Sequence, residues 1–86
     1  MIRLLFAGDF IPMDADVEFS SELIDTIFDA NLSFVNLESP ITNTKNGILK
    51  TGNNFKVGQE SGRLIIDKLP FNIFCLANNH ILDFGY

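Results

Sequence analysis

Apolar residues in this sequence gather into three short runs, at residues 2–7, 32–37 and 71–77. Residues that favour turns bound these runs, among them Asn31 and Pro70. Nearly continuous apolar runs of this length are typical of strands buried on both faces of a parallel sheet. The pattern therefore predicts three strands, with the phenylalanine side chains in the core.

Two stretches between the runs have the spacing of amphipathic helices. Ser20 and Ser21 offer capping hydroxyls ahead of apolar residues at helical intervals, and Asn31 marks the predicted end of this helix. Residues 59–69 form the second predicted helix, although Gly62 weakens it by about 1 kcal/mol relative to Ala. Residues 42–54, rich in Asn, Thr, Lys and Gly, predict a surface loop with a weak hairpin.

The order of these elements predicts an α/β fold. Parallel strands joined by right-handed crossovers give the sequence β-α-β-α-β. A chain of 86 residues is long enough for one domain at most. All strands of a parallel sheet end along one edge, where ligands bind, so the residues after each strand are expected to meet in space.

Composition and charge narrow the possible functions. The net charge of −5 and the absence of any basic run argue against nucleic acid or an anionic membrane as a partner, and are compatible with bound divalent metal. Cys75 and His80 are the only residues of their types, which excludes an internal disulfide or a four-ligand zinc site. Cys75 is expected to be buried and inert. No apolar run approaches the ~18 residues of a transmembrane helix, so the cytoplasm is the default localisation.

Polar residues follow each predicted strand. Asp9 follows the first strand, Glu38 the second, and Asn78, Asn79 and His80 the third. Two carboxylates, a carboxamide and an imidazole suit Mn²⁺, Fe²⁺, Co²⁺ or Zn²⁺ better than Ca²⁺. A phosphate ester is the natural substrate of such a cluster, because two metals about 3.5–4 Å apart activate hydroxide and neutralise phosphoryl oxygens.

Each of these residues also has a purely structural interpretation. Asp9 can cap the turn after its strand, and Glu38 can be a solvated carboxylate at a strand end. The segment 78–80 can be a turn tied by hydrogen bonds between side chains and backbone. We favour function for this last segment, since its side chains are expected to converge with the other two groups.

The motifs together resemble those of the CapA-like capsule synthesis family. The resemblance rests on Gly8-Asp9, on Asn36-Leu37-Glu38 with Pro40, and above all on Ala77-Asn78-Asn79-His80 followed by Asp83 and Gly85. This family is similar to the calcineurin-type metallophosphatases, which are built as a four-layer α/β/β/α sandwich. The resemblance implies a metal-dependent phosphoesterase-like hydrolase acting in poly-γ-glutamate capsule or envelope polymer synthesis.

The resemblance also implies roles for individual residues. Asp9 would bind one metal, Glu38 would bridge both, and Asn79 would bind the other through its side-chain carbonyl. His80 would act on the substrate as general acid or transition-state stabiliser, roles to which histidine side chains are well suited near neutral pH. Asp83 would orient the His80 ring.

The sequence departs from the superfamily pattern in three respects. Ile11 stands where a metal-binding histidine is usual, Glu38 replaces an aspartate, and His80 is the only imidazole. We therefore expect residues 1–86 to be the N-terminal part of the domain, with a binuclear site only in the complete domain and negligible activity alone. A non-catalytic binding or assembly module is the alternative.

Two further expectations concern partners and localisation. Exposed sheet edges in a partial domain favour self-association between copies. The family resemblance allows the full protein to be membrane-associated or extracytoplasmic, although the chain itself contains no membrane segment.

Overall fold

The computed structural model describes residues 1–85 and confirms the α/β class, with three parallel strands in β-α-β-α-β order. The elements, in chain order, are β1 (Leu4–Phe10), α1 (Ser21–Asp29), β2 (Leu32–Leu37), α2 (Gln59–Lys68) and β3 (Ile73–Cys75). The strands form one sheet in the order β1-β2-β3. The central strand is therefore β2, and its end lies between the ends of the other two.

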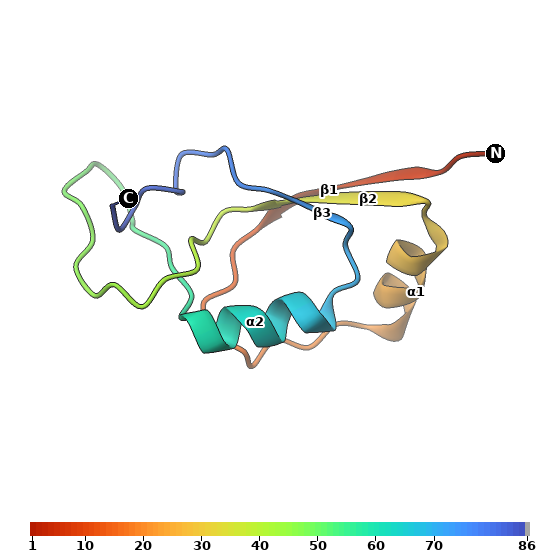
Figure 1. Ribbon diagram of the computed structural model, residues 1–86, viewed down its shortest axis with the longest axis horizontal. Helices are drawn as coiled ribbons and strands as arrows, with labels where there is room; N and C mark the ends of the chain where they lie inside the picture. The colour runs from red at the N-terminus through yellow and green to blue at the C-terminus, as the bar shows by residue number, and fades with distance from the viewer. Residues whose placement is uncertain (86) are drawn as a thin grey trace.

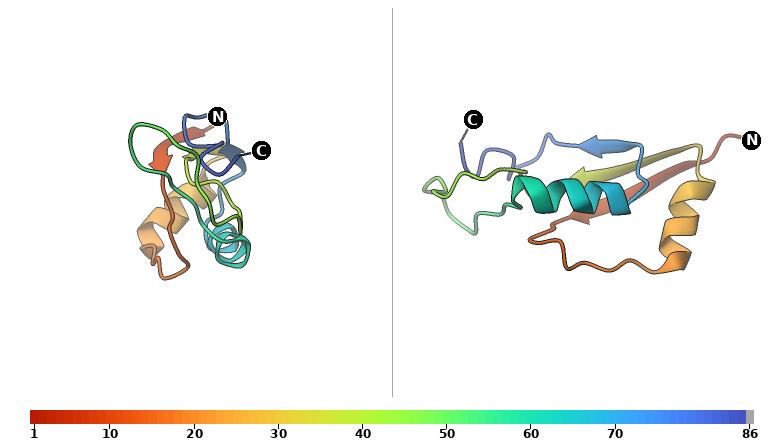
Figure 2. Two further views of the ribbon diagram at one scale, coloured as in Figure 1. Left: turned by 90° about the vertical axis from the view of Figure 1, so that its left-hand side faces the viewer. Right: turned by 60° about the horizontal axis from the view of Figure 1, so that its bottom comes forward.

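Both helices lie against the same face of the sheet (Figures 1 and 2). Each crossover leads to the next strand in the same direction across the sheet. Two crossovers that are both right-handed then place their helices on the same face. Alternate residues of β2 point into this layer, so Ser33, Val35 and Leu37 are buried. They pack in the core with Ile27 of α1 and Ile65 of α2, the buried residues of a hydrophobic stripe on each helix.

The opposite face of the sheet is uncovered and apolar. On this face, Leu4 of β1 lies opposite Leu32 of β2, and Phe6 lies opposite Phe34. The rings of Phe6 and Phe34 stack at 4.7 Å between centroids, yet Phe6 is 69% exposed. The prediction that the strands are buried on both faces is therefore wrong for this part of the chain, as is the prediction that every phenylalanine is core.

Three of the predicted elements, and the predicted burial of Cys75, need correction. The first strand runs to Phe10, because pairing with β2 resumes at Asp9 after a shift in register. The third strand is shorter than residues 71–77. The predicted hairpin is replaced by a parallel bridge between Ile41 and Val57. Cys75 is exposed, since it pairs with Asn36 on the open face of the sheet.

The predicted helices are close to those observed. The Ser20 hydroxyl accepts a hydrogen bond from the Leu23 N–H and caps α1. The helix ends at Asp29, two residues before the predicted stop at Asn31, and the side chain of Asn31 instead accepts a hydrogen bond from the N–H of Arg3. No helix within residues 1–85 is long and apolar enough to cross a membrane.

Candidate functional site

Asn36 joins the two carboxylates at the carboxyl edge of the sheet. Its side-chain amide donates to Asp9 Oδ1 at 2.8 Å and to Glu38 Oε1 at 3.2 Å. The backbone supports this arrangement, because Asp9 is the register partner of Asn36 and the Glu38 N–H donates to the carbonyl of Phe10. Asp9 is exposed, while the Glu38 side chain is 12% exposed. The structure therefore brings the two predicted carboxylates together across one amide.

Asn78 connects the turn after β3 to the same edge. Its amide donates to Asn36 Oδ1 at 3.2 Å and to the Leu37 carbonyl at 2.8 Å. Its own Oδ1 accepts the N–H of His80 at 3.0 Å. The structural interpretation of this segment as a turn tied by side-chain hydrogen bonds thus applies to Asn78. Asn79 is exposed, and within residues 1–85 it forms no side-chain hydrogen bond with Asp9, Glu38 or His80.

His80 is held on both sides of its ring. Its Nδ1 lies 2.8 Å from Asp83 Oδ2, and its Nε2 lies 3.8 Å from Glu38 Oε2. The His80 side chain is 12% exposed, and the Asp83 side chain is fully buried. The contact between His80 and Asp83 is the one that the resemblance implied. It leaves Nε2 as the ring atom that faces Glu38.

Asp83 is ionised despite its burial. Burial by itself raises the pKa of the carboxyl group, but hydrogen bonds from Lys50, from the Phe55 N–H and from His80 outweigh it and lower the pKa from 3.8 to about 2. An ionised carboxylate can only accept hydrogen bonds. The Nδ1 atom of a neutral His80 must therefore carry the proton, which leaves the Nε2 lone pair free.

Sequence reasoning missed two residues of this site. The ring of Phe55 lies against His80, with 4.3 Å between centroids and an angle of 43° between planes. Lys50 reaches Asp83 from the same loop. Nothing in the sequence pattern separates these residues from an ordinary solvated loop, since their partners lie about thirty positions later and no periodicity connects them.

A comparison with protein families identifies the family of the chain. The family model described as bacterial capsule synthesis protein PGA_cap matches residues 4–86. The chain belongs to this family. No curated protein and no solved structure matches the chain. The match spans β1, β2 and β3, and so includes every residue of the candidate site described above.

The side chains of this PGA_cap chain fit a divalent metal by type, but not by number. Carboxylate, amide and imidazole groups are suitable donors. Within residues 1–85, however, no group of three or more His, Cys, Asp or Glu side chains could hold a metal ion. Asp9 and Glu38 each accept a hydrogen bond from the Asn36 amide, and His80 offers only Nε2. The described residues thus form an incomplete donor set.

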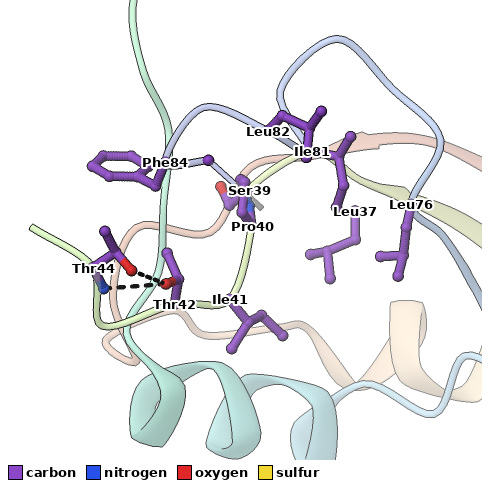
Figure 3. A pocket seen from close by; sticks show the side chains of 11 residues that line it. Leu37, Ser39, Pro40, Ile41, Thr42, Thr44, Leu76, Ile81, Leu82 and Phe84 are labelled. Carbon is purple, nitrogen blue, oxygen red and sulfur yellow. Dashed lines mark hydrogen bonds between the residues drawn. The ribbon is translucent and has the colours of Figure 1, made fainter. Parts of the chain in front are cut away.

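An apolar pocket of about 570 Å³ adjoins the His80 turn (Figure 3). It lies between the segment after β2 and the segment after β3, and its lining comprises Leu37, Ser39, Pro40, Ile41, Thr42, Thr44, Leu76, Ile81, Leu82, Phe84 and Gly85. None of the five predicted site residues lines it. The buried hydroxyl of Ser39 has no hydrogen-bond partner among the described residues. The pocket is therefore next to the candidate site, but the polar side chains of that site do not line it.

Proposed function

We propose that this chain contributes part of a metal-dependent phosphoesterase site that acts in poly-γ-glutamate capsule or envelope polymer synthesis. The observation that carries the proposal is the His80 ring, held by Asp83 at Nδ1 and directed toward Glu38 at Nε2. A group with this support suits proton transfer to a substrate oxygen. Family membership supports the link to capsule synthesis.

The proposed roles of the residues combine this arrangement with the family resemblance. Asp9, Glu38 and Asn79 would hold divalent metal, with further donors from outside residues 1–85. The metal, when bound, supplies an activated hydroxide and neutralises charge on the phosphoryl oxygens. Asn36 keeps the two carboxylates at a fixed separation. As general acid, the doubly protonated His80 ring would give the Nε2 proton to the leaving oxygen and return to the neutral form protonated at Nδ1, while Asp83 keeps Nε2 pointed at the site.

Hydrolysis of a chromogenic phosphodiester by the complete domain with Mn²⁺ tests the proposal; in the tests that follow, the protein means this complete domain, as distinct from the 86-residue chain alone. We expect Glu38→Gln and His80→Gln each to lower kcat by about 10²- to 10⁴-fold, the usual effect of losing a proton-transfer group or a metal ligand. Glu60→Gln is the matched control, because this carboxylate is exposed on α2 and makes no side-chain hydrogen bond with the site residues described above. Absence of hydrolysis of any phosphoester by the wild-type protein would overturn the proposal.

The 86-residue chain alone should bind Mn²⁺ weakly and hydrolyse nothing at a measurable rate. The reason is the incomplete donor set within residues 1–85. Isothermal titration calorimetry checks this, with Asp9→Asn expected to abolish the weak binding. Tight binding of two Mn²⁺ ions per monomer would contradict the expectation.

A non-catalytic binding or assembly module is the second candidate. It is favoured by Ile11, which occupies the place of a usual metal-binding histidine and is exposed. Replacement of Asp9 and His80 by Ala in the protein separates the candidates. Loss of capsule polymer synthesis supports catalysis, whereas unchanged synthesis supports the module.

A further inference from the structure

The loop of residues 47–56, which we call the clamp loop, is attached to the His80 turn by several contacts. The Ile48 N–H donates to the Asp83 carbonyl at 2.8 Å, and the Phe55 N–H donates to Asp83 Oδ2 at 2.6 Å. The Phe55 ring also lies against the His80 ring. The loop has no helix or strand of its own, so these contacts define its position.

Lys50 makes the most direct of these contacts. Its ammonium group donates to Asp83 Oδ1 and lies 3.2 Å from His80 Nδ1. The Lys50 side chain is 19% exposed, while that of Asp83 is fully buried. The cation therefore enters the protein to meet the carboxylate rather than pointing into solvent.

The short distance between Lys50 and His80 reflects a shared acceptor. An ammonium group has three donors and no lone pair, and a protonated Nδ1 has no lone pair either. The two nitrogens cannot bond to each other. They converge because Asp83 offers one oxygen to each, Oδ1 to Lys50 and Oδ2 to His80.

We propose that Lys50 is a positioning residue for His80 and acts through Asp83. A buried carboxylate is stable only when its charge is compensated and its oxygens have partners. Within residues 1–85, Lys50 is the only side chain with a full positive charge that contacts Asp83, and the only partner of Oδ1. It thereby fixes the rotation of the carboxylate, which presents Oδ2 to Nδ1 and leaves Nε2 facing the site. This inference rests on the proposed role of His80 at the substrate.

Kinetic comparison of Lys50→Met, Lys50→Arg and wild type in the protein with Mn²⁺ and a phosphodiester provides the first test. We expect K50M to lower kcat about tenfold or more, as is typical when an outer partner of a site residue is lost, with KM within about twofold. K50R should recover most of kcat, because it restores a charged donor to Asp83. Lys45→Met is the control, since Lys45 is exposed outside the clamp loop.

Nitrogen-15 NMR of the His80 ring provides the second test and is independent of activity. The His80 signals are assigned by their loss in His80→Gln. We expect one tautomer, protonated at Nδ1, in wild type and K50R, and a mixture of tautomers in K50M, with every spectrum recorded at a temperature at which K50M is still folded. If wild type hydrolyses nothing, the proposed function fails and this measurement still decides the role of Lys50.

Three results would overturn the inference. The first is a single Nδ1-protonated ring in K50M. The second is an increase in KM at unchanged kcat, which would mean that Lys50 contacts the substrate directly. The third is failure of K50R to recover kcat while it melts at the wild-type temperature.

Discussion

Asp83 is a buried carboxylate that contacts both Lys50 and His80. Its folded pKa of about 2 lies below the ordinary 3.8. A lowered carboxyl pKa contributes stability that is fully present above the unfolded value and is lost as the pH falls through the folded value. For Asp83 this window extends from about pH 4 down to about pH 2.

Asp83→Asn should therefore destabilise the protein in a pH-dependent way. At pH 7 we expect a loss of about 3 kcal/mol in the free energy of unfolding, because Lys50 loses its charged partner within a buried network. The difference between D83N and wild type should shrink as the pH falls from 4 to 2. Urea denaturation across this range measures it.

Asp67→Asn is a suitable control for this prediction, since Asp67 is an exposed carboxylate on α2. It should leave stability nearly unchanged at every pH. A difference between D83N and wild type that stays constant from pH 7 to pH 2 would contradict the assignment of an ionised Asp83.

At the level of elements, Gly62 shows why a helix former is absent from the middle of α2. A Cβ atom at this position would lie 2.8 Å from Cγ2 of Ile41 and 3.1 Å from its Cγ1. The branched side chain of Ile41 cannot bend away easily, so the helix approaches the segment after β2 only because residue 62 has no side chain. The predicted cost of glycine in the helix is therefore offset by closer packing.

Gly62→Ala should consequently destabilise the protein by about 1–3 kcal/mol, the usual cost of overpacking, although alanine is the better helix former. In an Ile41→Ala background the same change should be neutral or stabilising by up to about 1 kcal/mol. Thermal unfolding of the four variants in this cycle measures the coupling. Equal effects of G62A in both backgrounds would contradict the packing explanation.

The elements themselves could be predicted from local pattern. The stripes of α1 and α2 and the apolar run of β2 gave bounds close to those observed, because periodicity and capping act within a few residues. The bounds of β1 and β3 could not be predicted as well. Their ends depend on pairing with β2, which is a contact between segments far apart in the sequence.

The candidate site likewise contains residues that could be predicted from the sequence and residues that could not. Asp9, Glu38 and His80 were predicted to converge because parallel strands end at one edge, and the structure brings them together. The metal-binding and catalytic roles of these residues remain predictions. Lys50 and Phe55 could not be found, since they come from a loop whose path is set by the turn on which it packs.

At the scale of the whole molecule, the most prominent feature is the uncovered apolar face of the sheet. Phe6, Leu4 and Leu32 are all more than 40% exposed there. Large exposed apolar patches favour association. We expect the 86-residue chain to self-associate at micromolar to millimolar concentration, as measured by analytical ultracentrifugation.

Phe6→Asn should weaken this self-association, because it removes the most exposed ring of the open face. Phe28→Asn is the matched control, since Phe28 is 70% exposed but lies on α1, on the other side of the sheet. A monomer at all concentrations, or equal effects of the two substitutions, would contradict this prediction.

The register shift in β1 has a consequence for how chain length can vary. Three steps in β1, from Phe6 to Asp9, lie opposite two steps in β2, from Phe34 to Asn36. The extra residue is absorbed inside the strand. Deletion of Gly8, whose position has no neighbouring atom within 4 Å of an added Cβ, would restore regular pairing and still leave the aspartate opposite Asn36. The number of residues between the apolar run of β1 and Asp9 can thus differ by one without moving the Asp9 carboxylate to the other face of the sheet.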